Sequence, residues 1–436
     1  MKSSNKIFKI LFAFSIFQSS FYSSDITYGL RLKKSFSNFN LKSAIFEDSN
    51  YGDGLYTWLH FDFGKMKYVN EMCMSSIQDD MIRGSGKKVM GKYGFSNQGY
   101  IEFDLKSDEL KHKLIFGRAY IDHGFGKSSR LLVSKWSRPF DQLTWQAFYK
   151  GLRGSVSGVQ LNSIDNINRY FSIHTIDFNL LKNFTVSFGE SSLYAGEHRG
   201  IELQYFNPTL FWIPVRENQP KQNQANGFLY FGLKYAQENF SIWSEYLLDD
   251  YQIDKSVQEP TTYAFLFGAE LKHLQYIINS VWIEYSMAAN QTYQTHGQYG
   301  EENYVHRDFP IGHYLGNDFD NLVANLNFQK TKVLNLTLEP ILRISLIRDG
   351  ANGIEIPYYE PWNFEENLKD NFNFDFPTGP VSNYFESALT GKLSLNKNSY
   401  IEIGLINQNL EYQKNSKSNY AMLLRYYLAF DRNINY

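Results

Sequence analysis

The sequence predicts an all-β protein, a transmembrane antiparallel up-and-down β-barrel of about 16–18 strands. Three observations lead to this prediction. Long runs in the C-terminal half alternate between apolar and polar residues, and the N-terminus resembles a secretory signal peptide. Aromatic residues make up 17% of the chain although its mean hydropathy is −0.41. A barrel accounts for all three, because half of each wall strand faces lipid and half faces a wet lumen.

The N-terminal segment is the first element in chain order. Residues 1–24 contain three lysines, an apolar stretch at 10–17 and then a cluster of serines. This order is typical of a cleaved signal peptide, and the apolar stretch is too short to span a bilayer. We therefore expect residues 1–24 to be removed and residues 25–436 to form one barrel domain in the outer membrane of a Gram-negative cell.

The strands are predicted from alternation. From Leu334 to Leu346 the even positions are mostly leucine or isoleucine, whereas the odd positions are mostly polar or charged. Similar runs occupy 322–328, 385–395 and 420–430, and alternation begins near the N-terminus at Ile26. Successive side chains of a strand point to opposite faces, so each run predicts one lipid-facing and one lumen-facing surface.

Connection lengths predict the orientation of the barrel. Tight turns are expected at 237–239, 273–275, 331–332 and 396–398, and long connections at 207–226, 250–261, 288–318 and 348–382. Outer-membrane barrels have short periplasmic turns and longer outer loops, so these four long segments are predicted to lie outside the cell. Nine strands fit between residues 228 and 430, and seven to nine more are expected before them.

Charge and motif content exclude several function classes. A net charge of −2 argues against a nucleic-acid partner, and the single Cys73 allows no disulfide framework. No catalytic constellation is visible, so we expect no enzymatic activity and no cofactor. His296, His306 and His313 share one predicted loop, but their spacing does not specify a metal site, and none is predicted.

Two groups of short motifs resemble a known family. The first consists of Ile115–Arg118, His123–Gly126 and Leu131–Ser134, and the second is Tyr304–Asp318. Together they resemble the capsule-assembly Wzi family of outer-membrane barrels, over roughly residues 95–430. The motif residues that we single out are Gly117, Arg118, Gly124, Gly126, Pro310, Gly312 and Gly316.

These motif residues also have a structural interpretation that needs no family. A glycine at 117 removes bulk from the barrel wall, and glycines at 124 and 126 permit turns that other residues cannot adopt. Pro310, Gly312 and Gly316 would fix a compact path for the loop at 288–318. A role of these motif residues in shaping the wall and loops is therefore an alternative to a direct role in glycan binding.

The resemblance implies a monomeric barrel in outer-membrane lipid that helps assemble or retain capsular or surface polysaccharide, in a lectin role. Such a barrel would be inserted by the barrel-assembly machinery. Tyr358, Tyr359 and Trp362 lie in the segment 348–382 beside several glutamates, and we predict that they form a sugar-binding platform.

One departure from the family favours an alternative function. The better-known members carry a helical segment before the barrel that blocks its periplasmic end, whereas strand-like alternation here begins almost at once. An open lumen would suit a porin or substrate channel, which is the alternative to the polysaccharide role.

Overall fold

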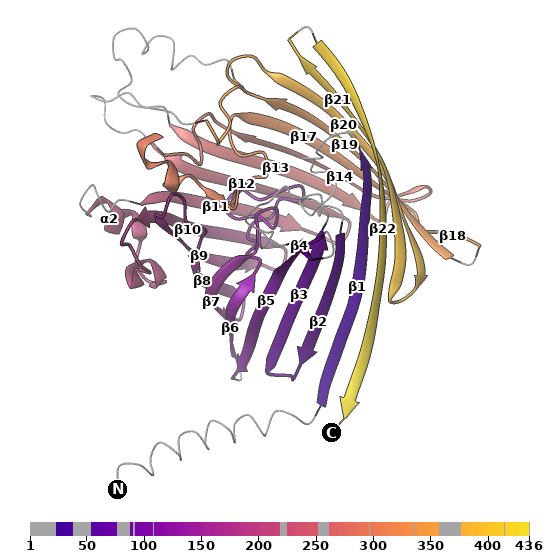
Figure 1. Cartoon of the computed structure of the whole chain (residues 1–436), viewed down its shortest axis with the longest axis horizontal. Helices are drawn as coiled ribbons and strands as arrows, with labels where there is room; N and C mark the ends of the chain where they lie inside the picture. Colours follow the sequence, from indigo (N-terminus) through magenta and orange to yellow (C-terminus); the bar gives the residue numbers. More distant parts are fainter. Residues whose placement is uncertain are drawn as a thin grey trace.

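Figure 1 shows the computed structural model of the chain. The structure describes residues 23–37, 54–75, 88–89, 92–107, 109–218, 225–251, 261–295, 297–334, 336–356, 376–413 and 415–435. The predicted signal segment 1–24 therefore lies outside the described residues except for its last two positions.

The described residues form one sheet of 20 strands that closes on itself. Two of these strands, β4 (Lys88–Val89) and β18 (Thr331–Val333), are short, and the other 18 make the barrel wall. The wall strands are β1 (Ser23–Ser37), β2 (Gly54–Asp62), β3 (Met66–Ser75), β5 (Lys92–Lys106), β6 (Leu110–Ala119), β7 (Phe140–Tyr149), β8 (Leu152–Gln160), β9 (Asn168–Leu181), β10 (Phe184–Gly196), β11 (Asn226–Ala236), β12 (Phe240–Asp250), β13 (Thr262–Lys272), β14 (Ile278–Ala288), β17 (Phe319–Phe328), β19 (Leu336–Asp349), β20 (Ser382–Asn396), β21 (Ser399–Tyr412) and β22 (Asn415–Asn435).

The topology is up-and-down and antiparallel, as predicted. Each wall strand pairs with the next one along the chain, and β22 returns to pair with β1, where Phe430 lies opposite Tyr28. This closing pair leaves the sheet without a free edge, which is how a barrel satisfies all its backbone hydrogen bonds inside a membrane. The predicted fold class and strand number are confirmed.

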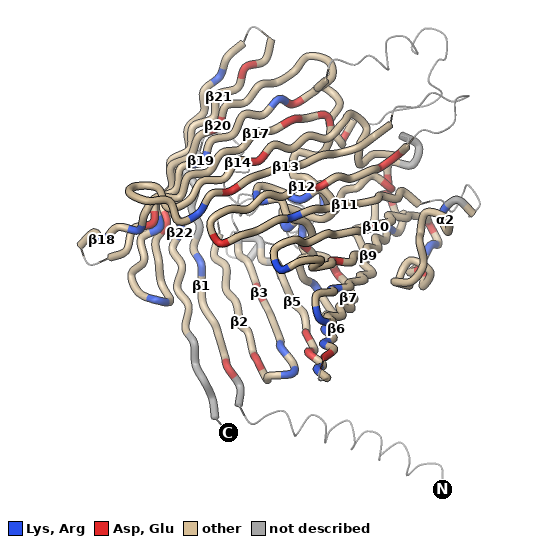
Figure 2. Tube along the Cα trace, turned by 180° about the vertical axis from the view of Figure 1, so that it is seen from behind, with Lys and Arg blue, Asp and Glu red and all other residues tan. Residues whose placement is uncertain are grey.

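The two faces of the wall also agree with the alternation. In β20 the side chain of Leu389 is 52% exposed on the outer face, whereas that of Glu386 is fully buried on the inner face. The last strand behaves in the same way, with Met422 and Leu424 exposed and Leu423 buried between them. Figure 2 shows many of the charged residues near the turns and strand ends, away from the middle of the wall.

Leu334 departs from the prediction. The alternating run was expected to start there, but Leu334 is 91% exposed and has φ +49 at the turn between β18 and β19. Its neighbours Thr331–Val333 form β18, which folds back on Leu336–Leu338, so the predicted tight turn at 331–332 is a short strand. Leu334 in the turn continues the spacing of Leu336 and Leu338 in the strand, so alternation alone could not locate the turn.

The connections differ in length between the two ends of the barrel. Turns such as 150–151, 182–183 and 237–239 are tight, and β1 starts and β22 ends at the same end of the barrel as these turns (Figure 1). The opposite end carries the longer connections at 120–139, 197–225, 251–261, 289–318 and 350–381. We call this the loop end. That it faces the outside of the cell remains a prediction.

The helices within the described ranges are short and lie in loop-end connections. They are η1 (Leu203–Phe206), α2 (Trp212–Glu217) and η3 (Gly297–Glu302), and a two-stranded hairpin, β15 (Val305–His306) with β16 (Phe309–Pro310), lies beside η3 in sequence. None of the helices that the structure describes has the length and apolar character needed to cross a bilayer.

Candidate functional site

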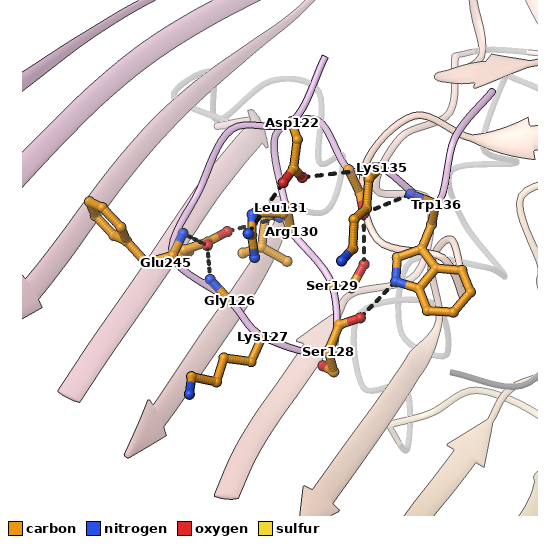
Figure 3. A network of polar contacts seen from close by, with 12 residues as sticks. Asp122, Gly126, Lys127, Ser128, Ser129, Arg130, Leu131, Lys135, Trp136 and Glu245 are labelled. Atoms are coloured by element: carbon orange, nitrogen blue, oxygen red, sulfur yellow. Dashed lines mark hydrogen bonds and ion pairs between the residues drawn. The ribbon is translucent and has the colours of Figure 1, made fainter. Parts of the chain in front are cut away.

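The connection at 120–139, between β6 and β7, enters the barrel and is held by carboxylates of the opposite wall. Glu245 of β12 accepts hydrogen bonds from three backbone N–H groups of this loop, those of Phe125, Gly126 (2.6 Å) and Leu131 (2.9 Å). Figure 3 shows the Glu245 side chain pointing into the curve of the loop. Three donors converging on one buried carboxylate fix the backbone path of the loop.

The neighbouring strands supply two more acidic anchors. Glu284 of β14 accepts hydrogen bonds from the backbone N–H groups of Lys127 (2.7 Å) and Ser128 (2.8 Å) and from Trp243 Nε1 (2.6 Å). The Lys127 ammonium forms an ion pair with Glu270 of β13 and lies over the ring of Trp243. Wall carboxylates on three consecutive strands therefore hold residues 125–128 and Leu131 of the loop.

A second connection, residues 289–318, packs on the first. The Tyr293 and Tyr304 hydroxyls donate to the carbonyls of Leu131 and Leu132, at 2.7 and 2.8 Å, and both tyrosines are fully buried. The two connections share a core cluster with inward-facing wall residues such as Phe228. We name residues 120–139 together with 289–318 the lumen plug, because they fill part of the lumen from the loop end.

The glycines of the plug are required by close packing. Gly124 has φ +136, and a Cβ there would lie 2.6 Å from a carboxylate oxygen of Glu245. A Cβ on Gly126 would lie 2.1 Å from the Ser129 carbonyl oxygen, and one on Gly312 would lie 2.5 Å from that of Leu131. Gly124 therefore allows close contact between plug and wall, and Gly126 and Gly312 allow close packing within the plug, in agreement with the structural interpretation of the motif.

The buried histidines of the plug are neutral structural residues. His313 shares a hydrogen bond with Ser286 of β14 (3.1 Å), and His306 with the Pro139 carbonyl (3.3 Å). Burial lowers the pKa of each to about 3. The residues that the structure describes contain no group of three or more His, Cys, Asp or Glu side chains suited to a metal ion. The third predicted loop histidine, His296, lies outside the described residues.

Comparison with known proteins gives the family. A model described as capsule assembly protein Wzi matches residues 92–341, more than half of the 436-residue chain. The chain belongs to the capsule assembly protein Wzi family. No match was found among curated proteins.

Solved structures agree with the fold of this Wzi-family barrel. It is similar to Escherichia coli Wzi, an outer-membrane protein involved in group 1 capsule assembly and a carbohydrate-binding β-barrel, with 12% identity, a TM-score of 0.62 and coverage of 98% of this chain and 88% of that chain. It is also similar to the outer-membrane protein opdK from Pseudomonas aeruginosa, with 8% identity, a TM-score of 0.53 and coverage of 94% and 99%. At such identities the likeness concerns the fold alone.

The remaining family motif residues of this Wzi-family barrel lie at the loop end. Gly117 has φ +119, and a Cβ there would lie 2.4 Å from the Gly99 carbonyl oxygen, so the wall requires a glycine. Arg118 forms a two-pronged ion pair with Asp141 of β7 (2.8 and 2.6 Å), which Arg307 of the plug approaches at 3.9 Å. The pair links two wall strands beneath the plug hairpin.

Gly316, with φ +79, lies in the turn that leads from the plug into β17, and Pro310 lies in β16. The loop 288–318 therefore follows a compact path, as Pro310, Gly312 and Gly316 predicted. Gly316 also packs against Ile354 of the next connection, where a Cβ would come within 3.2 Å of the isoleucine side chain.

The connection 350–381 is tied to the plug at both of its described ends. Asp318 accepts hydrogen bonds from the backbone N–H groups of Asn352 (3.1 Å) and Thr378 (2.9 Å), and Gln294 donates to the Ile356 carbonyl (2.8 Å). The residues between these anchors include Tyr358, Tyr359 and Trp362, which lie outside the described residues. The predicted sugar platform therefore remains a prediction, on a loop whose ends are fixed.

Sequence reasoning missed the acidic anchors. Glu245 and Glu284 occupy lumen-facing positions of their strands, where alternation predicts any polar residue. The available signal was that Glu245 stands between Trp243 and Leu247 on the same face of its strand, and that Glu284 has Trp282 as one of its two same-face neighbours. An acid in such surroundings needs a partner, and here the partner is loop backbone.

Proposed function

We propose that this barrel helps assemble or retain capsular or other surface polysaccharide at the outer face of the outer membrane, acting as a lectin. Membership of the Wzi family supports the proposal, as does the fold shared with E. coli Wzi, itself described as a carbohydrate-binding β-barrel involved in capsule assembly. The polysaccharide is the partner, and the chemistry is recognition without catalysis.

The lumen plug is the observation that carries the proposal. A channel needs a wide polar path, but the plug fills part of this lumen with a buried apolar and aromatic core. Asp318 and Gln294 of the plug also form hydrogen bonds with the described ends of the connection 350–381. A loop whose described ends are both anchored suits the binding of a long polymer outside the barrel.

The proposal also includes a route to the outer membrane. We expect residues 1–24 to act as a cleaved signal peptide, and the barrel-assembly machinery to insert residues 25–436 into outer-membrane lipid as a monomer. β1 begins at Ser23, opposite Asn435, so cleavage after residue 24 would remove only the first two positions of that strand.

The test removes the predicted platform and leaves its anchors. Residues 357–375 are replaced by a short Gly-Ser linker between Ile356 and Phe376, which removes Tyr358, Tyr359 and Trp362. The control removes residues 252–260 from the connection between β12 and β13 in the same way. In a strain that makes capsule, we expect the first variant to shed polysaccharide into the medium at a normal level of synthesis, and the control to retain it.

Barrel assembly is verified in both strains by heat-modifiable mobility on gels. Retention of capsule by the platform deletion would reject this loop as the binding site. Retention by a strain lacking the whole protein would reject the polysaccharide role itself. High single-channel conductance of the wild-type protein in planar bilayers would favour the porin alternative.

A further inference from the structure

The outer face of the wall at β9 and β10 carries an unusual pair of polar residues. His174 and Glu190 lie on the same face as the lipid-exposed residues Ile176 and Phe188, because Ile176 is two positions after His174 in β9 and Phe188 is two positions before Glu190 in β10. His174 Nε2 and Glu190 share a hydrogen bond of 3.1 Å. A carboxylate facing hydrocarbon is costly, so this position needs a cover.

The cover is the connection between β10 and β11. Glu190 accepts hydrogen bonds from the backbone N–H groups of Trp212 (2.9 Å) and Ile213 (2.6 Å), at the start of α2. The Trp212 ring stacks on His174 with 4.1 Å between ring centroids. The segment 197–218, which we call the outer flap, therefore folds down over the outside of the barrel (Figure 1).

An apolar groove lies where the outer flap meets the lipid face. Its cavity volume is about 660 Å³, within the roughly 300–1,000 Å³ typical of ligand pockets. On the wall side it is lined by large apolar residues of β7, β9, β10 and β11, and on the flap side by Leu210 and Phe211. The wall residues are Trp145, Ile176, Phe188, Leu229 and Phe231.

The groove is continuous with the membrane. Phe188 is 47% exposed on the lipid face and Phe211 is 79% exposed on the flap, so both line the groove and also face outward. Ile201 and Leu203 of the flap are exposed as well. Exposed apolar side chains beside a lipid-facing wall are buried by hydrocarbon, because water contact would cost each of them free energy.

We propose that this groove binds an acyl chain of lipopolysaccharide. The flap belongs to a loop-end connection, and we predict that this end faces the outside of the cell. The flap side of the groove then opens toward the outer leaflet of the outer membrane, where lipopolysaccharide is the main lipid. The ligand would be the lipid A part, with one chain between Phe211 and the wall. This inference concerns lipid at the side of the barrel and does not depend on the polysaccharide role.

The test places a large side chain inside the groove. Gly154 of β8 lines the groove, and a Cβ there meets nothing within 4 Å, so Gly154→Phe places a ring in open space without a backbone clash. The matched control is Ala269→Phe on β13, which adds the same ring to the wall away from the groove lining. Ala147→Phe, from β7, repeats the test if Gly154→Phe fails to assemble.

Delipidated full-length protein in detergent is mixed with purified lipid A or with phosphatidylethanolamine, and bound lipid is counted by native mass spectrometry. We expect one lipid A on the wild type and on Ala269→Phe, and about tenfold lower occupancy on the groove-filled variant, the effect of losing about two buried methylene groups. Equal lipid A occupancy in all proteins would overturn the proposal. So would preferential retention of phosphatidylethanolamine, or a dimer that covers the groove in place of lipid.

Discussion

Removing one wall carboxylate should release the lumen plug. In Glu245→Ala, the backbone N–H groups of Phe125, Gly126 and Leu131 lose their acceptor at a position where the carboxylate is almost completely buried. An unsatisfied buried donor costs about 1–3 kcal/mol, so three of them cost about 3 kcal/mol at the low end of that range. A loss of this size lowers the docking equilibrium constant of the loop by a factor of about 100.

Two measurements report the release. Lys127 and Arg130 in the loop are trypsin sites, so undocking should accelerate cleavage at these positions in the detergent-solubilised barrel. Conductance in planar bilayers should rise as the lumen opens. The control is Glu339→Ala, which removes an acid of β19 that pairs with Lys330 (2.8 Å). If Glu245→Ala and Glu339→Ala both behave like the wild type, the wall carboxylates do not hold the loop.

Two further predictions concern the membrane face and pH. Leu389→Arg should lower the free energy of unfolding of the inserted barrel by about 2–4 kcal/mol, measured by urea unfolding from lipid vesicles. Thr390→Arg, one position along β20 and on the lumen face, should have a far smaller effect. Equal effects of the two substitutions would mean that the faces are assigned wrongly. His313 has its pKa lowered to about 3 by burial, whereas the undocked histidine has an ordinary pKa near 6.5. Docking of the plug therefore loses stability progressively as the pH falls below about 6.5, because the undocked loop takes up a proton that the docked loop does not. Cleavage of the plug by trypsin, expressed relative to the trypsin rate on an unstructured peptide at the same pH, should therefore increase between pH 7.5 and pH 5.5, with a weaker dependence in His313→Gln.

The barrel could be predicted from sequence because its information is local. Alternation in β20 assigns Leu389 to lipid and Glu386 to the lumen without knowledge of any partner strand. Closure of the sheet then follows from the need to satisfy every backbone group in hydrocarbon. Turn positions such as that of Leu334 were harder, since a turn residue can continue the apolar repeat by coincidence.

The lumen plug could not be predicted because its contacts join residues far apart in sequence. Leu131 and Glu245 are separated by 114 positions, and nothing local marks either as a partner of the other. The motif glycines gave a partial signal, since Gly124 and Gly312 indicated tight backbone packing. They could not show that the packing surface is the inside of the barrel. Strand-like alternation near the N-terminus favoured an open lumen, whereas the structure places residues 120–139 and 289–318 inside the barrel.

The position of Asp318 connects the plug with the proposed retention of polymer. In the proposed function, a polysaccharide bound to the connection 350–381 would pull on it, and that force would reach the rest of the protein at the two ends of the connection. Both described ends of the connection 350–381 meet at Asp318, through Asn352 and Thr378, and Asp318 directly precedes β17. Because β17 pairs along its length with β14 and β19, the force passes into the hydrogen-bonded wall. A loop anchored only to other loops would yield first, so anchoring at the start of a wall strand suits a protein that holds a long polymer at the cell surface.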